Sequence, residues 1–273
     1  MVKAVRIHAN GGPEVMCWEE IALPPPGAGE ARVRHTAIGI NYSDLNVRRG
    51  GFYLARPLRF PVVLGNEAAG VVESVGEGVT DVRAGDRVAY AGMRGEFFER
   101  TGAYAQARNV PAERLIKLPG SISDQQAAAM MVKGFTASLI INRIFRPKPG
   151  EPILVHTAAG GVGTILCQWS KHLGATMVGT AGSHKKAEIA KAQGCDHVLL
   201  YREVDLVAAV KAIAPQGVAA VFDGVGRDTF GACLDCVRPF GTLVNYATRR
   251  GTRLRSICFS SPSAGRSRSV VLH

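Results

Sequence analysis

Residues 153–163 read ILVHTAAGGVG, a short apolar run that passes directly into a glycine-rich turn. Aligned to the pattern G-x-G-x-x-G, the turn places Ala158, Gly160 and Gly163 at the three glycine positions. An amphipathic helical stretch follows at 165–173. A strand, a glycine-rich turn and a helix in this order are typical of a site where the free N–H groups of a helix start bind a phosphate.

Apolar, β-branched runs recur after this turn at a nearly regular spacing. Five such runs begin at Ile153, Thr176, His197, Val218 and Gly241, so successive starts lie 23, 21, 21 and 23 residues apart. Each interval holds an amphipathic stretch. Strands and helices that alternate at this spacing predict βαβ units with right-handed crossovers, and hence an α/β fold with a doubly wound parallel sheet. Residues 124–247 are therefore predicted to form a Rossmann domain.

Residues 1–123 follow a different pattern, in which short alternating strands are separated by proline- and glycine-rich turns. The expected strands are Val2–His8, Ala31–Ile38, Ala69–Val75 and Arg87–Tyr90. This pattern predicts a β-rich first domain with few helices. Ser123 is a suitable N-cap for a helix through 126–131, which marks the start of the second domain.

The composition excludes several classes of protein. No stretch approaches the roughly 20 consecutive apolar residues that span a bilayer. The first residues, MVKAVRIHANGG, lack the apolar core of a signal peptide. The six cysteines show no framework spacing, which fits a reducing compartment. We therefore expect a cytoplasmic protein without a membrane partner.

The net charge of +11 arises largely from the last 26 residues, 248–273, which hold six arginines and no acidic residue. Without them, 27 basic residues face 22 acidic ones, an excess of +5 that suits an enzyme for a phosphorylated cofactor. The segment shows neither strand nor helix periodicity. It is either a disordered basic tail or the product of an out-of-register reading frame. We prefer the second interpretation, because the change follows directly on a core strand.

The residues after the second strand bear on which dinucleotide binds. An NAD site places an acidic residue there for the ribose 2′-hydroxyl, but no acid occurs between Gly163 and Glu188. Ser183 and Lys186 stand there instead and suit the 2′-phosphate of NADPH. Alternatively, Ser183 caps the next helix and the lysine is solvated, and both interpretations can hold together. NADPH is the predicted cofactor.

With these motifs established, the sequence resembles the quinone oxidoreductase, or zeta-crystallin-like, branch of the medium-chain dehydrogenase/reductase superfamily. The resemblance runs from residue 1 to about residue 247. It is carried by HANGGPEV (8–15), AIGINYSD (37–44), LGNEAAGVVESVGEGV (64–79), AGDRVAY (84–90), KGFTA (133–137), HTAAGGVGTILCQWSKHLGA (156–175), VLLYRE (198–203) and FDGVGRDTF (222–230). It implies a GroES-like catalytic domain, a Rossmann domain and an active site in the cleft between them.

The resemblance also implies roles for individual residues. Asn41 would face the nicotinamide or the substrate carbonyl, and Tyr42 and Asp44 would shape the catalytic pocket. For Asp44 and for Glu67, a purely structural role in pairing buried polar groups is an equal alternative. The expected cofactor-binding residues are Asn41, Thr136, Ala159, Gly160, Gly161, Val162, Gly163, Ser183, Lys186, Tyr201 and Val225.

A metal site is not expected. The zinc enzymes of this superfamily bind catalytic zinc through a cysteine and a histidine, where this chain has Asn41 and Asn66. No cysteine occurs at 90–110, where a structural zinc would need four. Cys233 and Cys236 lie on a predicted helix, 228–237, and are interpreted as helix packing.

Without a Lewis acid, the reaction must use an acceptor that is already electrophilic. Hydride transfer from NADPH to a small quinone or enone fits this requirement. One alternative is a zinc-free enoyl or alkenal reductase. The other is a catalytically silent protein that binds NADPH or RNA, although one aromatic residue, Phe259, makes the tail a poor nucleic-acid platform.

The divergent tail also affects the expected assembly. In the resembled fold, the segment after residue 247 supplies the sixth strand of the sheet and the last elements of the catalytic domain. Its loss would leave the fifth strand as an open edge, which invites aggregation. The family's homodimer forms along that edge, so we expect no such dimer, low stability and weak or absent activity.

Overall fold

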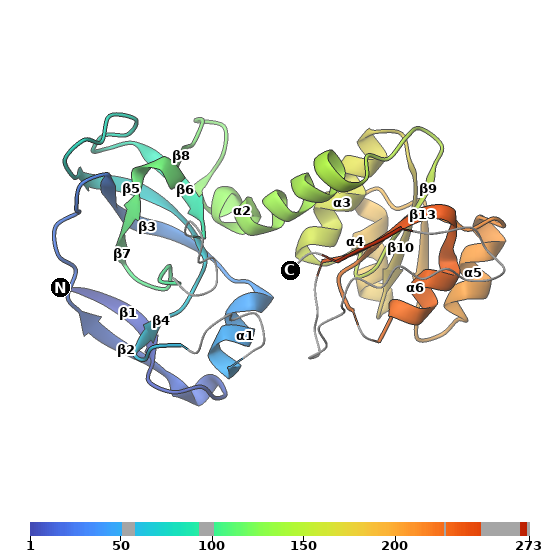
Figure 1. Ribbon diagram of the computed structural model, residues 1–273, viewed down its shortest axis with the longest axis horizontal. Coiled ribbons are helices and arrows are strands. Elements are labelled where there is room, and N and C mark those ends of the chain that lie inside the picture. Colours follow the sequence, from blue (N-terminus) through green and yellow to red (C-terminus); the bar gives the residue numbers. More distant parts are fainter. Residues whose placement is uncertain (51–57, 93–100, 227, 247–267, 272–273) are drawn as a thin grey trace. The chain divides into compact units, whose positions relative to one another are not determined.

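In the computed structural model, the chain forms two compact units, Met1–Val132 and Lys133–His273 (Figure 1). The structure describes residues 1–50, 58–92, 101–226, 228–246 and 268–271. The division between the units falls inside helix α2, Asp124–Leu139. Ser123 caps this helix as predicted, because its Oγ accepts the N–H of Gln126 at 3.2 Å. The predicted boundary, between residues 123 and 124, falls at the start of α2, whereas the two units divide between Val132 and Lys133.

The first unit is built from antiparallel strands, as predicted. One sheet has the order β2-β1-β4 and the other the order β7-β3-β5-β6-β8. Alanine and valine side chains between the strands form its main core, around the fully buried Tyr90. The elements are β1 (Val2–Ile7), η1 (Pro13–Val15), β2 (Met16–Ile21), β3 (Glu30–Gly39), α1 (Tyr42–Arg49), β4 (Val62–Val63), β5 (Glu67–Val75), β6 (Arg87–Ala91), β7 (Ala107–Pro111), η2 (Ala112–Arg114) and β8 (Ile116–Lys117).

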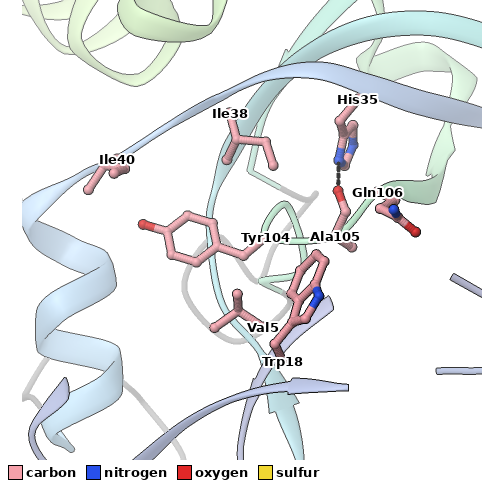
Figure 2. A pocket seen from close by; sticks show the side chains of 8 residues that line it. All are labelled: Val5, Trp18, His35, Ile38, Ile40, Tyr104, Ala105 and Gln106. Carbon is pink, nitrogen blue, oxygen red and sulfur yellow. Dashed lines mark hydrogen bonds between the residues drawn. The ribbon is translucent and has the colours of Figure 1, made fainter. Parts of the chain in front are cut away.

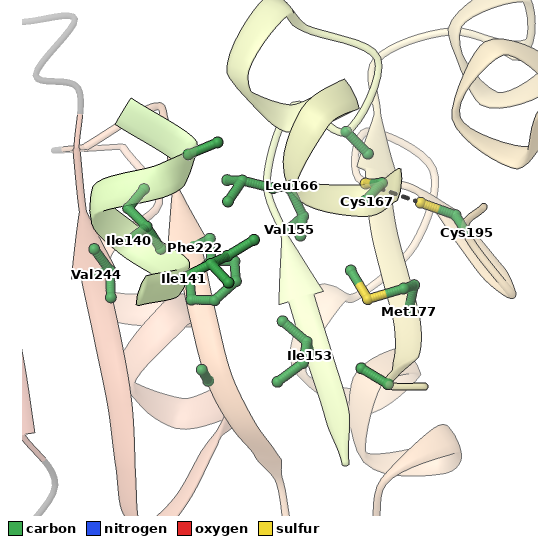
Figure 3. Packing of buried hydrophobic residues seen from close by; sticks show 14 of the residues in the cluster. Ile140, Ile141, Ile153, Val155, Leu166, Cys167, Met177, Cys195, Phe222 and Val244 are labelled. Atoms are coloured by element: carbon green, nitrogen blue, oxygen red, sulfur yellow. Dashed lines mark hydrogen bonds between the residues drawn. The ribbon is translucent and has the colours of Figure 1, made fainter. Parts of the chain in front are cut away.

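The second unit is a doubly wound parallel sheet of order β11-β10-β9-β12-β13-β14, which confirms the predicted fold class. Helices α3 and α4 pack on one face with the end of α2, and α5 and α6 pack on the other (Figures 1 and 3). The elements are η3 (Ile140–Ile144), β9 (Pro152–Val155), α3 (Gly161–His172), β10 (Thr176–Ala181), α4 (His184–Ala192), β11 (His197–Leu200), α5 (Leu206–Ile213), β12 (Val218–Asp223), α6 (Phe230–Cys236), β13 (Val237–Asn245) and β14 (Arg268–Val271).

Consecutive residues of the central strand serve opposite faces of this sheet. Ile153 and Val155 belong to the core under α3, whereas Leu154 belongs to the core under α5 and α6. Each of the two cores therefore receives side chains from the same apolar run. Trp169 of α3 packs against the first core and is partly buried. This arrangement explains why the strands read as continuous apolar runs rather than as alternating ones.

The fifth strand differs from the prediction at its start. It begins at Val237 rather than at Gly241, and α6 ends at Cys236. The register between β12 and β13 shifts after the pair Val218 and Val237, and Phe240 adopts a left-handed φ of 59°. A β-bulge leaves no periodic pattern in the sequence. The pattern of apolar residues therefore predicted only the regular part of the strand, from Gly241. Cys233 and Cys236 are fully buried, which confirms their predicted packing role.

The expectation that no strand follows β13 is wrong. Residues 268–271 form β14, which pairs in parallel with β13 and takes the sixth position in the sheet. β13 is therefore not an open edge, and the prediction of a missing dimer loses the premise on which it rested. Both interpretations of the tail otherwise fall on residues outside the described ones. β14 has only four residues, Arg268–Val271, two of them polar, so the sequence pattern did not reveal it.

Among the residues that the structure describes, no helix has the length and apolar character needed to cross a membrane.

Candidate cofactor and active sites

The glycine-rich turn after β9 has the geometry of an anion site. Gly160 is the N-cap of α3, so the N–H groups of Gly161, Val162 and Gly163 lie in the first helical turn, where an α-helix offers them no acceptor. Three aligned donors at the positive end of a helix dipole suit a pyrophosphate. The predicted residues Ala159 to Gly163 therefore lie together at one helix start.

A strained residue shapes this turn. Thr157 has a left-handed φ of 55°, which is rare for a β-branched residue. Its N–H donates to Thr180 Oγ1 at 3.3 Å, and its carbonyl accepts the Gly160 N–H at 2.7 Å. A Cβ on Gly163 would lie 2.2 Å from the same carbonyl oxygen. The turn thus depends on the missing side chain at Gly163.

Lys133 lies beside the turn, although the sequence did not predict it as a cofactor-binding residue. The aliphatic part of Lys133 packs on Gly161, with Cδ 2.9 Å and Cε 3.1 Å from the position a Cβ on that glycine would take. The charged end of Lys133 is therefore close to the start of α3. Lys133 is the first residue of the KGFTA motif, so the sequence offered a signal for it. Its location beside the turn, however, depends on how α2 packs against the turn.

The residues predicted for the 2′-phosphate gather at the carboxyl ends of β10 and β11. Ser183 is the N-cap of α4, and its Oγ accepts the Lys186 N–H at 3.5 Å. Tyr201 follows β11, and its hydroxyl lies 2.9 Å from where a Cβ on Gly182 would be. Arg202 lies over the Tyr201 ring, 5.7 Å from its centre. Ser183 and Tyr201 thus flank one edge of the sheet, with Lys186 on the adjoining helix.

Val225 lies in a turn after β12 that is organised by Asp223, which sequence reasoning missed. The buried Asp223 carboxylate accepts the N–H groups of Val225 at 2.8 Å and Gly226 at 3.2 Å. It also accepts the Thr229 hydroxyl at 2.9 Å and the Asn245 amide at 3.0 Å. The Asp-Gly pair in FDGVG was an available turn signal. The hydrogen bond from the Asn245 amide on β13 could not be predicted from the sequence.

In the first unit, Asn41 and Asp44 belong to one buried polar network. The Asn41 side-chain amide donates to Glu67 Oε1 at 2.7 Å, and the Asn66 amide donates to Asp44 Oδ1 at 2.9 Å. Asp44 Oδ2 also accepts the Asn41 N–H at 2.9 Å, so the carboxylate closes the first turn of α1. Tyr104 adds its hydroxyl to the same oxygen at 2.9 Å. Two amides therefore face two carboxylates.

Glu67 ties this network to α2. Its second carboxylate oxygen accepts the Val132 N–H at 2.6 Å, and the side chain is fully buried. A side chain on Gly39 would collide with both Glu67 and the Ala128 carbonyl, so the glycine allows β3 to pass closely. Glu67 thereby fixes the orientation of Asn41, which is 8 % exposed.

Burial governs the ionisation of the network. Burial raises the pKa of the Asp44 carboxyl, and the hydrogen bonds from Asn41, Tyr104 and Asn66 oppose that rise. Burial also raises the pKa of the Tyr104 hydroxyl, with a further contribution from the Asp44 charge. Tyr104 therefore stays protonated and acts as a donor.

The other two predicted residues lie at the surface or partly buried. Tyr42 begins α1 and is 41 % exposed, one residue after Asn41 of the network. Thr136 is partly buried in α2, three residues after Lys133. The predicted roles of Tyr42 in shaping the catalytic pocket and of Thr136 in cofactor binding stay predictions.

An apolar hollow of about 380 Å³ lies beside the network in the same unit (Figure 2). Trp18 and Ile40 line it and are 57 % and 70 % exposed. Its floor includes Tyr104, whose hydroxyl points to Asp44. Sequence reasoning named none of these lining residues. The sequence signal that could have indicated the hollow was the apolar residue Ile40 directly before Asn41, at a position that is exposed in the structure.

His35, at the wall of this hollow, is a buried neutral imidazole. Its Nδ1 lies 2.7 Å from the Ala105 carbonyl, which only accepts, so Nδ1 carries the proton. Nε2 then accepts the Tyr90 hydroxyl at 2.9 Å. Burial, with a smaller contribution from the charge of Arg108, lowers the pKa of His35 to about 4.

This shift predicts a loss of stability in mild acid. The unfolded chain protonates His35 near pH 6.5 and the folded chain near pH 4, so stability is complete above pH 6.5 and falls as the pH decreases. Between pH 7.5 and 5 the free energy of unfolding should fall by about 2 kcal/mol from this residue. Urea unfolding at both pH values measures the difference. In His35→Asn it should shrink by that amount.

A β-rich unit followed by a doubly wound sheet with an anion-binding turn defines a nucleotide-dependent dehydrogenase or reductase. Comparison with known proteins agrees. Residues 27–120 match the alcohol dehydrogenase GroES-like domain, and residues 161–271 match the zinc-binding dehydrogenase family. The second match includes β14.

Similar proteins narrow the class. A quinone oxidoreductase of Salmonella typhimurium is 43 % identical over 92 % of this chain and 74 % of its own length. A 2-haloacrylate reductase of Burkholderia is 42 % identical over the same shares. The crystal structure of Escherichia coli quinone oxidoreductase complexed with NADPH superposes with a TM-score of 0.85, at 41 % identity over 92 % of this chain and 74 % of that one. The chain belongs to the quinone oxidoreductase family of the medium-chain dehydrogenase/reductase superfamily, which confirms the resemblance seen in the sequence.

Proposed function

We propose that this protein transfers a hydride from NADPH to small quinones without a metal ion. The observation that carries the proposal is the anion-binding turn at the start of α3, with Lys133 beside it and Ser183 and Lys186 at the neighbouring strand end. The similarity to the NADPH-bound Escherichia coli enzyme supports the choice of cofactor. The test is NADPH oxidation by the purified full chain with 1,4-benzoquinone, followed at 340 nm.

The residues of the second unit fit this cofactor. The N–H groups of Gly161 to Gly163 would bind the pyrophosphate, and the Lys133 ammonium would balance its charge. Ser183 and Lys186 would hold the 2′-phosphate, and Tyr201 would pack on the adenine. When bound, NADPH supplies the hydride. The Asp223 carboxylate fixes the turn that carries Val225, which would lie along the cofactor.

The residues of the first unit do not fit zinc. The two positions that bind zinc in related enzymes hold Asn41 and Asn66, and zinc favours thiolate, imidazole or carboxylate ligands. Both amides donate hydrogen bonds to carboxylates, so each occupies a carboxylate oxygen that a cation would need. In this proposal Asn41, held by Glu67, faces the nicotinamide or the acceptor carbonyl. The acceptor itself must then be electrophilic.

A second candidate substrate class is an alkene conjugated to a carbonyl or carboxylate. The observation that favours it is the 42 % identity to a 2-haloacrylate reductase. Hydride addition to such an alkene uses the same cofactor and, like quinone reduction, requires no Lewis acid. Parallel assays with 1,4-benzoquinone, 2-chloroacrylate and an alkenal separate the classes, because the preferred class shows the highest kcat/KM.

The weak activity expected from the sequence rested on two premises, an open edge at β13 and the loss of the last elements of the catalytic domain. β14 pairs along that edge, so the argument from the sheet no longer holds. The turnover assay with 1,4-benzoquinone is therefore also the test of whether this chain is active.

Two lysine substitutions should distinguish the two phosphate sites. Lys186→Met should raise the Kd for NADPH about tenfold or more and leave the Kd for NADH unchanged, because only NADPH has the 2′-phosphate. Lys133→Met should raise both values about equally, because both dinucleotides have the pyrophosphate. Fluorescence titration of the reduced dinucleotides gives the four constants.

Lys211→Met is the matched control, because Lys211 lies on α5, over the opposite face of the sheet. Its two Kd values should equal those of the unmodified chain. If Lys186→Met weakened NADH as much as NADPH, the assignment of the 2′-phosphate to α4 would be wrong.

A further inference from the structure

Two buried cysteines from distant parts of the sequence meet in the core of the second unit. Cys167 lies in the middle of α3, and Cys195 lies between α4 and β11. Their Sγ atoms are 3.3 Å apart and share a hydrogen bond (Figure 3). Both are free thiols. A disulfide places its sulfur atoms about 2.05 Å apart, so bond formation needs a closure of little more than 1 Å.

This thiol pair lies directly under the cofactor turn. A Cβ on Gly179 of β10 would lie 2.6 Å from Cys195 Sγ and 2.8 Å from the Ala158 side chain. Cys195 and Ala158 therefore share the space left by that glycine. Cys167 belongs to the helix whose first turn contains Gly161 to Gly163. A change in the distance between the two sulfur atoms must therefore act on the turn or on α3.

The two thiols are not equivalent. Cys167 is completely buried, whereas Cys195 is 7 % exposed. The hydrogen bond with Cys167 lowers the pKa of the Cys195 thiol, because it stabilises the Cys195 thiolate. The same interaction raises the pKa of the Cys167 thiol. Cys195 is thus the nucleophile of the pair and Cys167 the resolving thiol.

We propose that Cys167 and Cys195 form a reversible disulfide when the protein meets hydrogen peroxide, and that this oxidation weakens NADPH binding. The Cys195 thiolate attacks one peroxide oxygen, the O–O bond breaks, and after protonation water leaves and Cys195 carries a sulfenic acid. The Cys167 sulfur then attacks Cys195 Sγ, the S–O bond breaks, and a second water leaves. Overall, two thiols are oxidised and one peroxide is reduced to two waters.

The effect on the cofactor follows from the packing. Closure of the sulfur pair draws α3 and the α4–β11 connection together, and Cys195 and Ala158 of the turn both pack over Gly179. The donors at the start of α3 then lose their alignment. This consequence rests on the proposed NADPH site, whereas the formation of the disulfide does not.

The first test measures the disulfide itself. The full chain is treated with a small excess of hydrogen peroxide under native conditions, alkylated and analysed by intact and peptide mass spectrometry. The expected result is the loss of two hydrogens and one crosslinked peptide pair that joins Cys167 and Cys195, both reversed by dithiothreitol. Stable sulfinic acid at Cys195, a crosslink to Cys17, or no reaction at these two residues would overturn the proposal.

Matched variants separate proximity from burial. Cys233 and Cys236 are also buried and lie three residues apart on α6. Cys233→Ala should still form the disulfide, whereas Cys167→Ala should not. Alanine is used because it fits a buried apolar site with little loss of stability. A crosslink between Cys233 and Cys236 as rapid as the first would contradict the specificity of the pair.

The second test measures the consequence. Oxidation of the full chain should raise the Kd for NADPH at least threefold, and dithiothreitol should restore it. Cys195→Ala should bind NADPH normally and show no change with peroxide. A disulfide that forms without any change in Kd would refute the link to the cofactor and leave the oxidation established. No NADPH binding by the reduced chain would instead refute the proposed function.

Discussion

Gly163→Ala should abolish NADPH binding at accessible concentrations, with a Kd raised about a hundredfold or more. The added Cβ would lie 2.2 Å from the Thr157 carbonyl oxygen and 3.0 Å from the same residue's carbonyl carbon. Thr157 cannot move away easily, because its carbonyl holds the Gly160 N–H and its own N–H is bound to Thr180. Relief of the collision must therefore displace α3 from the turn, and the three donors of the helix start move with it.

The same substitution should reduce the free energy of unfolding by about 3 kcal/mol, because the collision involves backbone on both sides. Fluorescence titration and urea unfolding measure the two effects. Gly231→Ala is the control, because Gly231 lies in α6 and a Cβ there meets nothing within 4 Å. It should leave binding unchanged and stability equal or slightly higher. Normal NADPH affinity in Gly163→Ala would show that the turn does not bind the pyrophosphate.

Glu67→Gln should lower the free energy of unfolding by about 3 kcal/mol although it changes only one atom. Both oxygens of the buried Glu67 carboxylate accept a hydrogen bond, one from the Asn41 amide and the other from the Val132 N–H. Glutamine presents one acceptor and one donor. In either orientation its NH₂ group faces another donor, so a buried polar group loses its partner. If the NH₂ group faces Asn41, that side chain also loses its fixed orientation.

Urea unfolding of the variant measures the loss of stability, and kcat with 1,4-benzoquinone measures the loss of orientation. Glu73→Gln is the matched control on the same strand. Glu73 is partly exposed and pairs with Arg34 at 3.1 Å, so its replacement should cost less than about 1 kcal/mol. Equal losses in the two variants would mean that the buried network does not depend on the carboxylate.

The fold class could be predicted because it depends on local patterns. The apolar runs at 153, 176, 197 and 218 coincide with β9 to β12, and the glycines that end the intervening helices have left-handed φ values. Each of these signals lies within a few residues along the chain. β14 was missed because its position depends on pairing with β13, more than 20 residues earlier. A short strand of this kind has no local signature that distinguishes it from a tail.

The residues of the candidate site likewise fall into those with a local sequence signal and those without one. Gly160, Ser183 and Asn41 were predicted from motifs and lie at helix starts, where backbone geometry follows from local sequence. Lys133 and Asp223 were not predicted, although each contacts a predicted element. Their roles arise from contacts between elements far apart in the sequence. The backbone positions of the candidate site thus follow from local sequence, whereas the side chains that support them do not.

The exposed Trp18 at the apolar hollow has a practical consequence. The chain contains two tryptophans, and the other, Trp169, packs partly buried against the core of the second unit. Each compact unit therefore carries one intrinsic fluorophore, in contrasting environments. Trp18 is open to collisional quenchers and emits as an indole in contact with water, whereas Trp169 senses the packing of α3. The optical signals of the two units can thus be separated without any added label.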